Sequence, residues 1–350
     1  MERARKLFWL FCLTLLFLTA CSQDKPPQNE PEEEQPGPIE TGTDEEEREA
    51  RPVAPLTGMV VDEPIERRII GVMIDNAGPA RPQSGLGQAD MVYEILAEGD
   101  ITRYLALFHS EIPDVIGPVR SLRPYYLDIA RGYDAIIAHA GGSPAAKEEV
   151  DRTSYPSIDG TRSGGFAFYR TDHRRAPHNL YIGREKLLEG EERFGYNKDY
   201  SLPKFTFAEE GAEPDGKQAT QVTIKYAGSY QVAYEYDAAQ GLYTRYVKGE
   251  AHTDEQTGEA IVASNVLVIE TGHQVIDNAG RRVVDVSGEG RGYLFQRGKV
   301  QEITWKNVDG LIRPMINGEE VPLYPGPTWV NIIPDQPGLE TNVTYSQETP

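Results

Sequence analysis

Two arginines three residues apart, Arg120 and Arg123, stand just before Pro124. Proline is favoured in the first turn of a helix, where unpaired N–H groups and the positive end of the helix dipole attract anions. Guanidinium groups add paired donors that fit a phosphate or a carboxylate. We therefore predict an anion-binding cleft centred on residues 117–124. The other candidate anion-binding residues are Arg81, Arg103, Ser121, His139, Gly142, Ser143, Arg175 and His178, and the candidate acidic partners are Asp75, Asp90 and Glu94.

A second helix entrance of the same design follows. His139 ends an apolar run, residues 141–142 form a Gly-Gly turn, and Ser143 can cap a helix whose first residue is Pro144. A strand, a glycine turn and a helix are typical of phosphate-binding loops. The spacing matches neither the P-loop nor the dinucleotide fingerprint, so plain turn chemistry explains the segment equally well.

Each candidate also has a structural interpretation. Arg120 and Arg123 can form ion pairs with Asp90, Glu94 or Glu98, and burial of those pairs would remove the cleft. A histidine at a strand end is more often a hydrogen-bonded core residue than a catalyst.

No pattern assigns a reaction. The sequence contains neither a G-x-S-x-G nor an H-E-x-x-H motif. Asp172, His173 and His178 crowd one loop but lack the spacing of a metal site. Ser143 and His139 are four residues apart across a tight turn, an unfavourable geometry for a nucleophile and its base. We leave the catalytic residues unassigned, expect no metal or cofactor, and favour a protein that is not an enzyme.

The first 21 residues have the features of a secretory leader. Arg3, Arg5 and Lys6 precede an apolar run at residues 7–18, which is short for a membrane span. The sequence Leu-Thr-Ala-Cys that ends at Cys21 resembles a bacterial lipobox. This resemblance implies a diacylglyceryl, palmitate-bearing Cys21 that anchors the chain to the outer face of a Gram-positive cell membrane.

A proline-rich acidic segment follows the leader at residues 22–58. It has little to bury, and we expect a disordered tether. The whole chain has a formal charge of -20, which argues against a nucleic-acid partner because phosphate backbones bind basic surfaces. Both cysteines, Cys12 and Cys21, precede the globular part, so no disulfide can stabilise it.

Residues 59–200 predict an α/β domain. An apolar strand at 68–76 leads into a Gly/Pro-rich loop, and strands at 91–98 and 101–109 flank a Gly-Asp turn. A helix over residues 89–97 is the alternative. Another helix is expected to begin at Pro124 and a further one at Pro144.

Residues 215–335 contain short segments in which apolar and polar residues alternate, separated by Gly and Asn turns. This pattern predicts a mainly antiparallel β domain, a sandwich or a barrel. Its tyrosines are expected to pack across strands, and a glycan-binding face is the alternative.

Several segments together resemble the YerB-type bacterial lipoproteins, which carry N- and C-terminal modules of unknown function. The segments are residues 80–86, 89–94, 98–103, 117–123, 139–143 and 177–179. The resemblance covers residues 60–335 and implies an extracytoplasmic lipoprotein with two modules. It implies no catalytic residue.

A second resemblance, in the order of residues, is to the LytR–CpsA–Psr transferases, which move polyprenyl-phosphate-linked glycans. The matching residues are Asp75, Arg81, Asp90, Arg120 or Arg123, and the glycines at 141–142. The family's serine–proline–arginine–aspartate segment is absent, and Asp128 is the nearest later carboxylate.

Two hypotheses follow. The first is a membrane-anchored envelope protein that binds an anionic wall ligand, such as a wall glycan or a polyprenyl phosphate, or a protein of wall synthesis. The second is a transferase or hydrolase that acts on phosphate-linked wall precursors and uses Mg²⁺.

Overall fold

The computed structural model describes residues 51–346. Cys21, the leader and most of the expected tether lie outside the described residues. The leader and residues 22–50 of the tether therefore remain predictions. The expected disorder does not extend to residue 58, because Ala54 and Leu56 are buried in the folded part.

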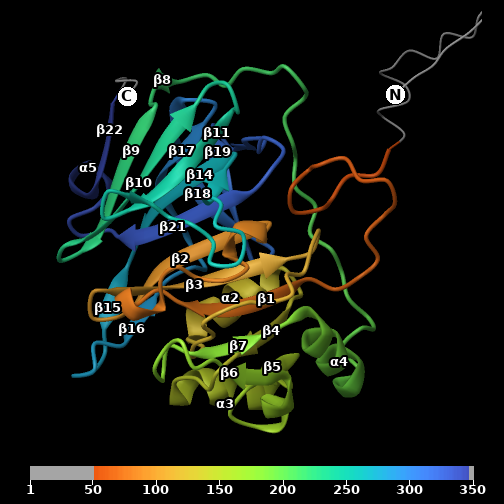
Figure 1. Ribbon diagram of the computed structural model, residues 1–350. Helices are drawn as coiled ribbons and strands as arrows, with labels where there is room; N and C mark the ends of the chain where they lie inside the picture. The colour runs from red at the N-terminus through yellow and green to blue at the C-terminus, as the bar shows by residue number, and fades with distance from the viewer. Residues whose placement is uncertain (1–50, 347–350) are drawn as a thin grey trace, which may run out of the picture. The chain divides into compact units, whose positions relative to one another are not determined.

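Within residues 51–346 the main sheet has 12 strands, in the order β20-β19-β18-β17-β14-β21-β2-β3-β1-β4-β5, with β8 paired to β18 (Figure 1). Its strands are β1 (Ile70–Asp75), β2 (Met91–Glu98), β3 (Ile101–Phe108), β4 (Ile136–His139), β5 (Ser157–Asp159), β8 (Lys217–Gln218), β14 (Asn265–Thr271), β17 (Glu289–Gln296), β18 (Lys299–Val308), β19 (Leu311–Ile316), β20 (Glu319–Glu320) and β21 (Thr328–Pro334).

A second sheet packs beside the C-terminal strands of the main sheet and consists of β12-β11-β10-β9-β22, with β13 paired to β11. Its strands are β9 (Gln221–Ala227), β10 (Tyr230–Asp237), β11 (Leu242–Val247), β12 (Glu250–Ala251), β13 (Val262–Ala263) and β22 (Val343–Ser346). Two small ribbons pair β6 (Phe168–Arg170) with β7 (Leu180–Ile182) and β15 (His273–Val275) with β16 (Arg282–Val284).

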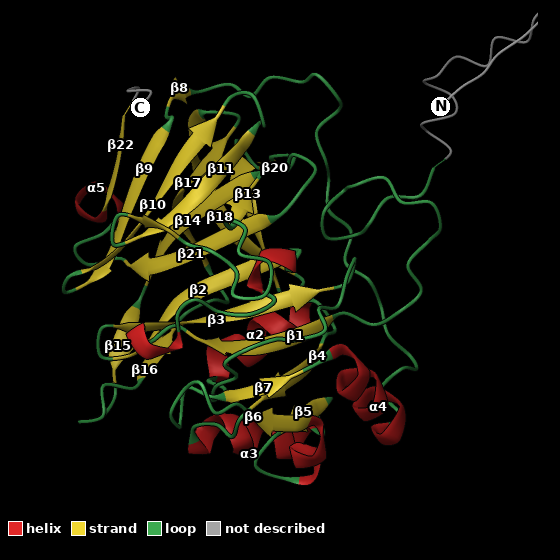
Figure 2. Ribbon diagram, viewed as in Figure 1, coloured by secondary structure: helices red, strands yellow, loops and turns green. Residues whose placement is uncertain are grey.

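The three longer helices cluster around the N-terminal half of the main sheet, and the short C-terminal helix lies beside the second sheet (Figure 2). They are α2 (Pro124–Gly132), α3 (Pro144–Thr153), α4 (Arg184–Phe194) and the short C-terminal α5 (Leu339–Asn342), with 3₁₀ turns η1 (Gly78–Ala80), η2 (Leu86–Gln88) and η3 (Ser163–Ala167). The fold class expected from the sequence is confirmed: a mixed α/β sheet precedes a mainly antiparallel β region.

The helices and the hairpin expected from local sequence patterns are present. Pro124 is the first residue of α2, and Ser143 caps α3 by accepting a hydrogen bond from the Ala146 N–H at 3.3 Å. Strands β2 and β3 form the expected antiparallel hairpin, so the alternative helix at residues 89–97 is wrong. Helix α2 buries one face on this hairpin, where the Tyr125 hydroxyl donates to the Leu96 carbonyl at 2.9 Å.

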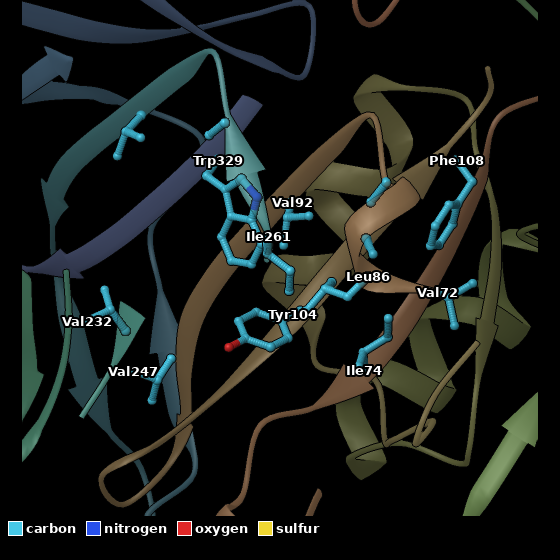
Figure 3. Close-up of a cluster of buried hydrophobic side chains, with 14 of the residues drawn as sticks. Val72, Ile74, Leu86, Val92, Tyr104, Phe108, Val232, Val247, Ile261 and Trp329 are labelled. Atoms are coloured by element: carbon cyan, nitrogen blue, oxygen red, sulfur yellow. The ribbon is translucent and has the colours of Figure 1, made fainter. Parts of the chain in front are cut away.

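Strand β21 joins the two halves of the chain. It comes late in the sequence, yet it pairs in parallel with β2 on one side and with β14 on the other. The apolar core is shared accordingly: Val92 and Tyr104 belong to the same buried cluster as Val232, Val247 and Trp329 (Figure 3). The main sheet therefore takes strands from both of the expected domains.

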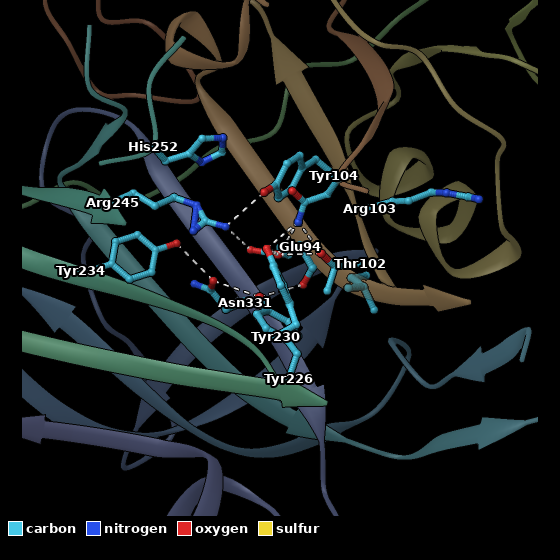
Figure 4. Close-up of polar contacts among 12 residues, drawn as sticks. Glu94, Thr102, Arg103, Tyr104, Tyr226, Tyr230, Tyr234, Arg245, His252 and Asn331 are labelled. Atoms are coloured by element: carbon cyan, nitrogen blue, oxygen red, sulfur yellow. Dashed lines mark hydrogen bonds and ion pairs between the residues drawn. The ribbon is translucent and has the colours of Figure 1, made fainter. Parts of the chain in front are cut away.

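A charged pair lies in the middle of this shared core. The Arg245 guanidinium of β11 donates from Nη2 to Glu94 Oε2 of β2 at 2.6 Å, and both side chains have an exposed fraction of 0% (Figure 4). The other carboxylate oxygen, Oε1, accepts from Thr102 at 2.7 Å and Tyr230 at 2.7 Å. The guanidinium lies 4.5 Å from the centre of the Trp329 ring. Burial of a charge is costly unless it is paired, so this pair couples the two halves.

Candidate functional site

The central stretch of residues 117–120 lies beside the end of β1. Asp75 N–H donates to the Pro118 carbonyl at 2.8 Å, and Arg120 N–H donates to the Met73 carbonyl at 2.8 Å. On its other side, Val119 N–H donates to the Leu180 carbonyl at 2.6 Å. The stretch is therefore an extended ribbon between β1 and β7, and it brings the Arg120 side chain to the carboxyl end of β1.

Three predicted residues meet there. Asp75 is buried, and its Oδ2 lies 2.7 Å from Nδ1 of His178 and 3.2 Å from Nε of Arg120. Its Oδ1 accepts a hydrogen bond from Ala77 N–H at 3.0 Å. The Arg120 and His178 side chains are 25% and 20% exposed, so a partly exposed arginine and a partly exposed histidine cover one buried carboxylate.

The Arg120 guanidinium keeps donors free. Within residues 51–346, its two Nη groups make no hydrogen bond to a protein acceptor, and the ion pair with Asp75 is made through Nε. Burial lowers the pKa of Arg120, and the nearby Asp75 carboxylate raises it. Because the pKa of an arginine lies far above neutral pH, Arg120 remains a cation. The free donors are available to an external anion.

A cavity of about 360 Å³ adjoins Arg120 and holds a second arginine, Arg170 of β6. Its other lining groups are apolar or neutral and include Thr161, Phe168 and Tyr169; among the described residues no Asp or Glu lines it. Arg170 donates from Nη1 to the Asn179 Oδ1 at 2.6 Å, which orients its guanidinium.

Arg174 holds the loop that carries His178. It donates to the carbonyls of Pro79 at 3.1 Å and Pro82 at 2.6 Å, and to the Glu255 carboxylate of the C-terminal half at 2.8 Å. The two ends of the loop form the β6–β7 ribbon, where the sequence predicted only a loop. The sequence did not predict this role of Arg174, because the groups that accept its hydrogen bonds lie up to 95 residues away.

Arg123 does not join Arg120. Its buried guanidinium forms an ion pair with the partly exposed carboxylate of Glu98, and Arg103 reaches the same carboxylate at 2.9 Å. Arg103 also donates to the Ser121 carbonyl at 2.8 Å, so Ser121 contributes its backbone. Of the structural pairs considered above, Arg123 with Glu98 is the one that forms.

Three other candidates hold parts of the fold together through hydrogen bonds within the protein: Arg81, Asp90 and Glu94. Arg81 donates to the Asn76 carbonyl at 2.9 Å, on the edge of the Glu94 network. Asp90 accepts hydrogen bonds from the backbone N–H of His109 at 2.5 Å and Ser110 at 2.9 Å. Burial raises the pKa of Asp90, while these hydrogen bonds act in the opposite direction.

The remaining candidates lie apart from Asp75. His139 is buried against Ser157, Gly142 lies beside Leu122, and Ser143 caps α3. Arg175 is exposed on the loop surface. The structure thus brings together Asp75, Arg120 and His178 from the predicted set and adds Arg170, for which the only sequence signal was the crowding of arginines in residues 169–180.

Among residues 51–346, no group of three or more His, Cys, Asp or Glu side chains is placed to hold a metal ion. No helix in the described part of the chain is long and apolar enough to cross a membrane.

The fold places the chain among proteins with two halves, in which a mixed α/β half shares one sheet with a mainly antiparallel β half. Two family models match the chain, described as the N-terminal domain (residues 56–197) and the C-terminal domain (residues 222–330) of "Protein of unknown function (DUF3048)". The chain belongs to this family.

A particular relative supports the same assignment. The chain is 39% identical over 286 residues to the Bacillus subtilis (strain 168) protein named "Putative lipoprotein YerB", an alignment that covers 81% of this chain and 86% of that protein. The crystal structure of YerB from Bacillus subtilis superposes with a TM-score of 0.78 at 36% identity, covering 85% of this chain and 100% of that one. The YerB-type resemblance expected from the sequence is confirmed.

Proposed function

We propose that this protein is an envelope lipoprotein, anchored through Cys21 at the outer face of the cell membrane, that binds a phosphate-bearing ligand between Arg120 and Arg170. The name of the Bacillus relative supports the anchor. The cavity supports the binding, because two arginines and no acidic residue line it in a chain with a formal charge of -20. That local reversal of charge is the observation on which the proposal rests.

The lining also suggests the chemistry of the ligand. Two guanidinium groups can donate paired hydrogen bonds to phosphate oxygens, each worth about 1.5–3 kcal/mol. Phe168 and Tyr169 add partly exposed aromatic surface beside them. A phosphate joined to an apolar chain, as in a polyprenyl phosphate, matches this combination better than a neutral glycan or a protein of wall synthesis.

Binding of matched lipids tests the proposal. We would titrate the full chain in mild detergent with farnesyl phosphate, farnesol and inorganic phosphate by isothermal titration calorimetry. Farnesyl phosphate should bind saturably and more tightly than inorganic phosphate, and farnesol should not bind. Equal binding of farnesol and farnesyl phosphate would contradict the proposal, as would the absence of binding by either phosphate compound.

A second candidate function is hydrolysis or transfer of the bound phosphate group. The favouring observation is the His178–Asp75 pair, because a carboxylate on Nδ1 is the arrangement that orients a histidine as a general base. Incubation of farnesyl phosphate with the protein, with and without Mg²⁺, should then release inorganic phosphate, and His178→Gln should abolish release without abolishing binding. No release above that of His178→Gln would reject this candidate.

A further inference from the structure

His139 and Ser157 come from neighbouring strands and face the same side of the sheet. Strands β4 and β5 are parallel, with Ile137 opposite Ser157 and His139 opposite Asp159. Because side chains alternate along a strand, His139 has the same orientation as Ile137, and so does Ser157. The Ser157 Oγ lies 2.7 Å from Nε2 of His139.

The backbone fixes the tautomer of His139. Its Nδ1 lies 2.7 Å from the Gly141 carbonyl, which can only accept, so Nδ1 carries the proton. Nε2 is therefore the acceptor for the Ser157 hydroxyl. The Gly141 peptide is held in turn by Asp159, whose Oδ1 accepts the Gly141 N–H at 2.8 Å. Ser157, His139 and the Gly141 carbonyl thus form an oriented series in which the histidine is ready to accept a proton.

The pair also borders open space. A cavity of about 380 Å³ is lined by His139, Ser157, Lys147 and Arg162, and also by the carboxylates of Asp151 and Asp159. It shares no lining residue with the cavity between Arg120 and Arg170. Lys147 makes no hydrogen bond or ion pair through its ammonium group within residues 51–346, although its charge acts on Asp151, which is the ion-pair partner of Arg162. A core histidine whose only role was to accept a hydrogen bond from Ser157 would need neither a cavity beside it nor a lysine in the lining of that cavity.

We propose that Ser157 and His139 form a nucleophile and its general base, acting on small carboxylic esters in this cavity. The Ser157 Oγ attacks the ester carbonyl carbon while its proton moves to Nε2 of His139. The bond from that carbon to the alkoxy oxygen breaks, and the alkoxide leaves with the proton from Nε2. Water then adds to the acyl-serine by the same proton path and releases the carboxylic acid, which restores both side chains. Lys147 supplies positive charge for the oxyanion formed in each step.

Covalent labelling of the full chain in mild detergent tests this activity. A fluorophosphonate probe should form one adduct on the peptide that contains Ser157, and Ser157→Ala should abolish that adduct. His139→Gln should slow labelling at least about 100-fold, the usual contribution of a general base. The matched control is Ser163→Ala, which removes another serine of the same cavity and should label at the wild-type rate.

The pH dependence separates a base from a structural histidine. Burial and nearby Arg162 lower the pKa of His139 while Asp159 acts in the opposite direction, so the fall in the wild-type labelling rate with decreasing pH should be centred below the usual histidine pKa of about 6.5. His139→Gln should lack this fall. An unlabelled wild-type protein, an adduct that persists in Ser157→Ala, or a His139→Gln variant that labels at the wild-type rate would overturn the proposal. These results do not depend on whether a phosphate binds at Arg120.

Discussion

Replacing Glu94 with glutamine is expected to lower the free energy of unfolding by about 3–5 kcal/mol, the usual cost of removing one partner from a buried ion pair. The reason is the position of Arg245, which is fully buried and has no acceptor for its Nε and Nη1 groups within the described residues. Its charge is balanced by Glu94 Oε2 at 2.6 Å. Glutamine would direct an amide toward the guanidinium and leave that charge uncompensated.

Urea unfolding followed by tryptophan fluorescence measures this effect, because Trp329 stacks on Arg245. Glu98→Gln is the matched control, since the Glu98 side chain is 31% exposed and water can replace part of its contacts. The loss in Glu98→Gln should be clearly smaller. Because Glu94 belongs to β2 and Arg245 to β11, both halves should still unfold in one transition. An unchanged midpoint in Glu94→Gln, or two separate transitions, would contradict the coupling described above.

Replacing Arg120 and Arg170 together with glutamine is expected to weaken binding of farnesyl phosphate at least about 100-fold, because two charge-assisted hydrogen bonds are lost. Each single variant should lose part of that affinity. The fold should persist, since both side chains are partly exposed and each has one ionic or hydrogen-bonded partner among residues 51–346. Isothermal titration calorimetry of the variants gives the affinities, and circular dichroism confirms that they are folded.

Arg175→Gln is the control for a general effect of charge. Arg175 lies on the same loop as His178 but is exposed and does not line the cavity. Its replacement removes the same charge and should change the affinity less than about threefold, because exposed charges outside a site are screened by salt. Equal losses in Arg175→Gln and the double variant would mean that binding is diffuse rather than local.

Signals that act over a few residues were predictable. Proline at the start of α2, the serine cap of α3 and the Gly-Asp turn between β2 and β3 each constrain the backbone locally, and each formed as expected. The partner of each arginine was not predictable. Arg123 pairs with Glu98 and Arg120 with Asp75 because of strand order and register, which composition does not encode.

The same limit applies to strand β21 and to His139. β21 is a nearly continuous apolar run, which is typical of a central parallel strand, but the run does not say that its neighbours are β2 and β14. The sequence placed Ser143 nearest to His139. The parallel pairing of β4 with β5 instead brings in Ser157, which lies 18 residues from His139. Parallel pairing joins residues across a crossover, so proximity along the chain is a poor guide to such contacts.

The central claim is that a phosphate-bearing ligand occupies the cavity between Arg120 and Arg170. Its most direct test is modification of arginines by phenylglyoxal, followed by mass spectrometry of peptides, with and without saturating farnesyl phosphate. Arg120 and Arg170 should become protected by the ligand, while Arg175 should react at an unchanged rate. Protection of neither cavity arginine, or equal protection of Arg175, would contradict the claim.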